Sequence, residues 1–133
     1  MKYLLTLITE EGGMEDRSPE EMREAMGKWQ AFTDETVKAG AFISGEGLQP
    51  SVTATTVRIP DDGAGDRTVT DGPFAESKEQ LGGFYLLECS DLDEALVWAK
   101  KIPMLGGVVE VRPVMDYEGL YESPPTEGAA AAS

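Results

Sequence analysis

Residues 81–89, LGGFYLLEC, form the segment that most constrains the fold of this chain. The run is short and apolar, as expected of a β-strand. Side chains alternate along a strand, so Phe84 and Leu86 face one side of the sheet and Tyr85 and Leu87 face the other. Because both sides are apolar, we predict a central strand in a sheet that is covered on both faces.

Two amphipathic helices are predicted to cover one of those faces. The first begins at Ser18, Pro19 and Glu21, which combine an N-cap, a first-turn proline and a capping box, and it ends at Gly40. Its apolar side chains recur at helical spacing and are expected in the core: Met22, Met26, Trp29 and Phe32. The second covers residues 90–102, with Ser90 and Asp91 as rival N-caps.

The remaining elements are strands, expected at residues 2–8, 41–48 and 108–115, with a hairpin formed by residues 54–59 and 67–70 around a turn rich in Gly and Asp. The order is then βαββαβ with an extra β-hairpin, an α+β fold of the ferredoxin-like type. Two helices cover only one face of such a sheet. A second copy of the same sheet, related by a two-fold axis, is the economical cover for the other face, so we predict a homodimer forming a dimeric α+β barrel.

Length and composition limit the other possibilities. A chain of 133 residues fits one domain, placed at 1–117, and residues 118–133 end in a small-residue stretch typical of a flexible tail. No membrane helix or signal peptide is expected, which favours a cytoplasmic protein. A net charge of −14 argues against direct binding to nucleic acid. The chain has no histidine and one cysteine, which excludes Ser-His and Cys-His nucleophiles and the usual zinc sites. We therefore expect no metal and no cofactor.

Five segments together resemble a known family: GEGLQP (45–50), ATTVR (54–58), TDGPFAESKEQLGGFYLLEC (70–89), DLDEALVWA (91–99) and VEVRPV (109–114). They are similar to DGPF-domain proteins of the YCII-related superfamily, over residues 2–114. The resemblance implies a ferredoxin-like fold and a dimeric α+β barrel. It also implies a link to sigma factors, beside which some relatives are encoded. Other relatives are proposed to be enzymes with a histidine and aspartate pair, which this chain cannot form.

The signature turn, residues 71–74, has two interpretations. Structurally, Asp71 accepts backbone hydrogen bonds, Gly72 permits a positive φ, Pro73 fixes the exit and Phe74 fills the core. Functionally, the turn directs Asp71, Glu76 and Lys78 into a cleft, where neighbouring charges favour acid and base chemistry. The structural interpretation is the commoner one for such a turn.

A second candidate site lies on the strands. Ser44 and Glu46 share a face of one strand, and Arg112 lies on the last strand. If the two strands are neighbours, Arg112 pairs with Glu46, either as an ordinary salt bridge or as the holder of a small anion. Tyr85 adds a hydroxyl, or is a core aromatic residue with a satisfied hydroxyl.

Three functions remain open from the sequence. The first is a homodimer that binds a small molecule or a protein partner in a cleft beside the 71–74 turn, through Ser44, Glu46, Asp71, Phe74, Tyr85 and Arg112. The second is a cofactor-independent lyase or isomerase that uses Asp71, Glu46 or Lys78. The third is a regulatory protein associated with a sigma factor.

Overall fold

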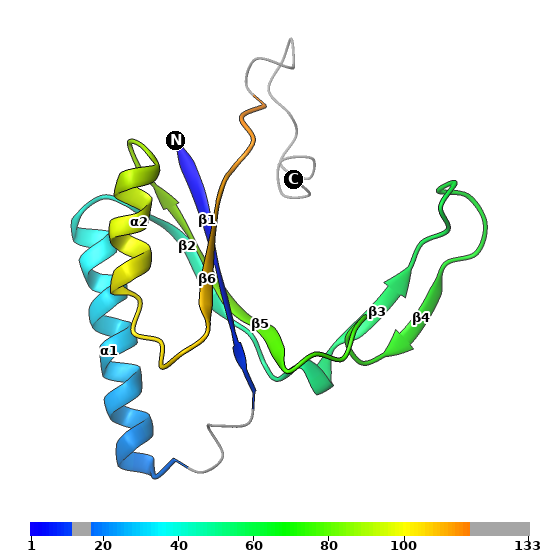
Figure 1. The fold of residues 1–133 in the computed structure, drawn as a ribbon, viewed down its shortest axis with the longest axis horizontal. Helices are drawn as coiled ribbons and strands as arrows, with labels where there is room; N and C mark the ends of the chain where they lie inside the picture. Colours follow the sequence, from blue (N-terminus) through cyan, green and yellow to red (C-terminus); the bar gives the residue numbers. More distant parts are fainter. Residues whose placement is uncertain (12–16, 118–133) are drawn as a thin grey trace.

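The structure is a computed structural model that describes residues 1–11 and 17–117. The elements along the chain are β1 (Lys2–Glu10), α1 (Pro19–Lys38), β2 (Phe42–Gly47), the short 3-10 helix η1 (Ser51–Thr53), β3 (Thr55–Arg58), β4 (Thr68–Asp71), β5 (Glu79–Glu88), α2 (Leu92–Lys101) and β6 (Val108–Pro113). Four strands form an antiparallel sheet in the order β2-β5-β1-β6, and β3 and β4 form a separate ribbon. The predicted ferredoxin-like α+β fold with an extra β-hairpin is confirmed (Figure 1).

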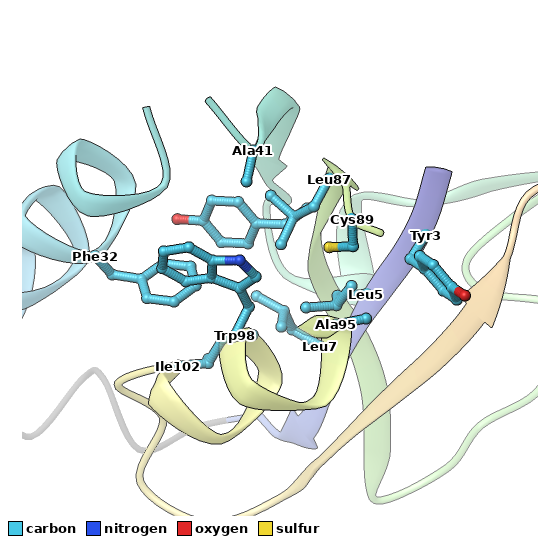
Figure 2. Packing of buried hydrophobic residues seen from close by; sticks show 11 residues of the cluster. Tyr3, Leu5, Leu7, Phe32, Ala41, Leu87, Cys89, Ala95, Trp98 and Ile102 are labelled. Carbon is cyan, nitrogen blue, oxygen red and sulfur yellow. The ribbon is translucent and has the colours of Figure 1, made fainter. Parts of the chain in front are cut away.

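The core lies between the sheet and the two helices. Leu5 and Leu87, from neighbouring central strands, are completely buried. Figure 2 shows these leucines facing Phe32 of α1 and Trp98 of α2, whose rings meet edge to face at 6.2 Å between centroids. The prediction that β5 is a central strand is confirmed, because it pairs with β1 on one side and β2 on the other.

Helix α1 begins as the sequence predicts. The Ser18 hydroxyl accepts a hydrogen bond from the Glu21 amide at 3.1 Å, and the Ser18 amide donates to the Glu21 carboxylate at 3.4 Å, which completes the capping box. The prediction that the whole apolar stripe is core is wrong, since Met26 is 66% exposed. Helix α2 is half as long as α1 and contacts its C-terminal part, through Phe32 and Glu35.

In α2, Asp91 and not Ser90 is the N-cap residue. Its carboxylate accepts a hydrogen bond from the Glu94 amide at 2.9 Å. Ser90 instead donates from its amide and its hydroxyl to the Glu94 carboxylate, at 2.7 and 3.0 Å. In the part of the chain that the structure describes, no helix combines the length and the apolar character needed to cross a membrane.

The second sheet face, here called the open face, carries no helix among residues 1–11 and 17–117, since α1 and α2 both lie on the opposite side (Figure 1). Its central positions follow from the strand register, which aligns Leu86 of β5 with Leu4 of β1 and Phe84 with Thr6. Toward one end, Leu81 and Val108 are 46% and 53% exposed. The open face is therefore an apolar surface with charged residues at its edges.

The ribbon of β3, β4 and their connection, residues 55–71, is here called the arm. It projects from one end of the four-stranded sheet (Figure 1). The register pairs Thr55 with Asp71 and Val57 with Val69, as in an antiparallel hairpin. The arm is the extra hairpin that the β-branched runs predicted.

Candidate functional site

A groove opens where the arm joins the sheet, and we call it the arm-base cleft. Its main part has a volume of about 400 Å³, and an adjoining hollow of about 300 Å³ shares Ser51, Pro73 and Gln80 with it. The main part is lined by Ser51, Val52, Asp71, Gly72, Pro73, Glu76, Ser77 and Gln80. The cleft therefore lies beside the 71–74 turn, where the functional interpretation expects it.

Gly72 holds the turn in place. Its φ of 97° lies in the region that side chains disfavour, so glycine is the residue that adopts it readily. The Gly72 amide donates to the Ala54 carbonyl, and the Gly72 carbonyl accepts from the Thr56 hydroxyl, both at 2.7 Å. Both the amide and the carbonyl of Gly72 thus hold the turn against residues 54–56, where β3 begins.

Two further sets of hydrogen bonds hold the other walls of the cleft in place. The Glu11 carboxylate, just beyond β1, accepts from the Ser51 amide and from the Ser51 hydroxyl, each at 2.7 Å. This carboxylate satisfies the start of η1. On the other wall, the Gln80 side-chain amide donates to the carbonyls of Ala75 and Ser77 at 3.3 and 3.1 Å. The cleft is therefore held by ordered loops at both sides.

The carboxylates of Asp71 and Glu76 give the cleft its charge. Both residues are exposed and line the cleft. Within residues 1–11 and 17–117, neither carboxylate has a hydrogen bond or an ion pair. The prediction that Asp71 accepts backbone hydrogen bonds is therefore wrong, because Gly72 makes the contacts that hold the turn. Since the lining contains no lysine or arginine, the cleft is acidic.

Lys78 does not enter this lining. Its ammonium lies 3.4 Å from the Glu10 carboxylate, with the two side chains 89% and 62% exposed. Such an exposed pair contributes little to stability. Of the predicted group of Asp71, Glu76 and Lys78, only the two carboxylates line the cleft.

Phe74 does not fill the core, and this prediction is wrong. Its side chain is 83% exposed. The positive φ of Gly72 and the following Pro73 lead the chain outward, so Phe74 lies beside the cleft at the surface. The core consists instead of buried residues that come mainly from β1, α1, β5 and α2.

The strand candidates do not converge within one chain. Ser44, Glu46 and Arg112 lie on the open face, but β2 and β6 are the two edges of the sheet, with β5 and β1 between them. Three strand spacings, together with an offset of two residues along the strands, separate Arg112 from Glu46 by about 16 Å. The predicted pairing of these two residues is therefore wrong.

Tyr85 faces the opposite side, toward the helices. Its hydroxyl lies 2.9 Å from that of Thr33 in α1, and its ring meets Phe32 edge to face. It is 9% exposed, so the alternative of a core aromatic residue with a satisfied hydroxyl is the one the structure shows.

Four residues that line the main part of the cleft were missed from the sequence: Ser51, Val52, Ser77 and Gln80. Ser51 and Gln80 each line both hollows. The run Gln49, Pro50 and Ser51 is typical of a break after a strand, but such a pattern does not indicate the wall of a site. Across the described ranges, no group of three or more acidic or cysteine side chains is placed to hold a metal ion.

Comparison with known proteins identifies the family. Residues 1–118 match the family model of the YCII-related domain. The chain belongs to the YCII-related family. It is also 38% identical over 121 residues to a protein of Rhizobium meliloti (strain 1021) named "Uncharacterized protein R00369", covering 89% of this chain and 95% of that protein. The membership predicted from the 70–89 signature is confirmed.

Proposed function

We propose that this YCII-related protein is a homodimer that binds a small molecule in the arm-base cleft. The observation that carries the proposal is the pair of unpartnered carboxylates, Asp71 and Glu76, on the wall of a cleft next to the signature turn. A volume of about 400 Å³ is in the range of small-molecule sites, which extend from about 300 to 1,000 Å³.

The lining favours a ligand that donates hydrogen bonds. Asp71 and Glu76 supply acceptors, Ser77 supplies a hydroxyl, and Pro73 and Val52 supply apolar surface. An anion would meet two carboxylates in a chain with a net charge of −14. Small amines, amino alcohols and neutral polyols fit this chemistry best.

The homodimer rests on the open face. Its centre is apolar, and both helices lie on the other side of the sheet (Figure 1). A contiguous apolar surface of this kind is typical of an interaction site. A catalytic role in the cleft would depend on Asp71 and Glu76, because Glu46 lies on the open face and Lys78 is paired outside the lining.

Native mass spectrometry of the full chain against a panel of small amines, amino alcohols and polyols tests the binding. Asp71→Asn removes one charged acceptor and is expected to weaken a ligand found in this way by about 10- to 100-fold. Asp66→Asn, an equal loss of charge in the exposed connection of the arm, serves as the control. A panel with no binder, or equal affinities for the two variants, would contradict the proposal.

A further inference from the structure

The arm is an amphipathic ribbon. Val57 and Val69 are directly opposite each other on one side, 53% and 65% exposed. Ile59 is the residue after β3 and is 52% exposed, and strand alternation extended by this one residue puts it on the same side. The other side carries polar residues: Thr56, Arg58, Thr68 and Thr70. The base of the valine side carries Thr55 and Asp71, so the apolar stretch occupies the outer part of that side. Such a stretch is the pattern of a ribbon that is buried there against another surface.

Nothing in the described chain supplies that surface. The arm points away from the four-stranded sheet (Figure 1), so the apolar side of the ribbon is without cover from β1, β2, β5 and β6. A two-stranded ribbon alone is marginally stable in water. The apolar side, Val57, Ile59 and Val69, therefore calls for a partner outside the chain.

A second copy of the chain is the occupant that the observations favour. The arm leads into the open face through residues 72–78, after which β5 begins next to the cleft. Leu81 of β5, 46% exposed, is paired with Ile8 of β1 near this end of the sheet. A two-fold axis that brings two open faces together lets each arm reach the other copy. Such a contact is reciprocal, as two-fold symmetry requires.

The area needed for a stable dimer supports this choice. Four strands about 4.8 Å apart, with lengths of 9, 6, 10 and 6 residues, give an open face of about 500 Å² on each copy, or about 1,000 Å² together. Stable interfaces bury about 1,200 to 2,000 Å². The apolar side of one arm covers about 150 Å², and two arms, each against an equal area of the other copy, add about 600 Å². Sheet and arms together reach the lower limit that the sheet alone does not.

We infer that the apolar side of each arm, Val57, Ile59 and Val69, packs on the second copy in the homodimer. The inference rests on the proposed homodimer. The register places Asp71 on the same side of the ribbon as Val69, two residues earlier in β4. The second copy therefore lies against the side of the ribbon that carries Asp71 at its base, next to the arm-base cleft.

The double variant Val57→Thr with Val69→Thr tests this step. Threonine keeps the β-branched shape, so the ribbon still forms, but the hydroxyls disfavour burial. Four such substitutions per dimer are expected to raise the dimer dissociation constant, measured by sedimentation equilibrium, at least about 100-fold. The control is Thr68→Val with Thr70→Val, the reverse exchange on the polar side, and it is expected to leave the constant unchanged.

The outcomes separate the two proposals. A wild-type chain that is monomeric at micromolar concentration overturns both the homodimer and the arm contact. A wild-type dimer whose dissociation constant is unchanged in the Val57→Thr, Val69→Thr variant overturns the arm contact and leaves the homodimer standing. Equal weakening by the control variant also overturns the arm contact, because it would show no preference for the apolar side. Circular dichroism of each variant establishes that the domain is folded.

Discussion

Two glycine-to-alanine substitutions are expected to change stability in opposite directions, although each adds a methyl group to open space. A methyl at Gly72 or at Gly27 would meet no other heavy atom within 4 Å. Gly72 has a φ of 97°, and an alanine there is strained by about 1–2 kcal/mol. The lower entropy of the unfolded variant offsets part of this, which leaves a net loss of about 1 kcal/mol. Gly27 lies inside α1 without a positive φ, so Gly27→Ala gains about 0.5–1 kcal/mol.

The two variants are compared by urea unfolding at one fixed protein concentration, with tryptophan fluorescence as the signal. A difference of about 1.5–2 kcal/mol separates their midpoints by about 1 M urea. Hydrogen exchange at residue 72 reports the turn itself, because this amide donates to the Ala54 carbonyl. Its exchange should become about fivefold faster in Gly72→Ala and remain unchanged in Gly27→Ala. If both midpoints rise together and residue 72 stays protected, the left-handed turn that supports the cleft is refuted.

Three further substitutions test the contacts around the site and the core. Tyr85→Phe removes the hydroxyl contact with Thr33 and should lower the free energy of unfolding by about 1 kcal/mol without affecting ligand affinity; a loss of affinity at unchanged stability would place the hydroxyl in the site. Glu11→Gln weakens the capping of Ser51, so hydrogen exchange of that amide should accelerate, and unchanged exchange would count against the capping. Burial raises the pKa of the Cys89 thiol above its ordinary value of 9.0, so the free energy of unfolding of the wild type should fall as the pH rises past 9. Cys89→Ala should lack this part of the loss. Parallel curves of unfolding free energy against pH for the two proteins would refute the prediction.

The sequence predicted most of the fold because its signals are local. The capping box at Ser18, the acidic N-cap at Asp91 and the alternation in β5 each depend on residues a few positions apart. They were enough to place both helices and the central strand. Helical spacing gives the direction in which a side chain points, but it does not show whether another element packs against that side chain. Met26 is therefore exposed although it lies on the apolar stripe of α1.

The candidate site was predicted less completely because it depends on contacts between distant segments. Strand order decides that Glu46 and Arg112 lie at opposite edges, and no local pattern records that order. Glu11 and Ser51 are 40 residues apart and meet only in the folded chain. Asp71 lines the cleft, as the functional interpretation of its turn expected, but the backbone hydrogen bonds expected from local turn chemistry are not made within the described residues.

The most direct test of the central claim is a ¹⁵N NMR titration of the full chain with the amine or polyol found by native mass spectrometry. We expect the amide shifts to change at the arm-base cleft, at Ser51, Gly72, Ser77 and Gln80, and to saturate with one ligand per chain. Shifts confined to α1 or to the open face, with the cleft amides unmoved, would contradict the claim that this cleft is the binding site.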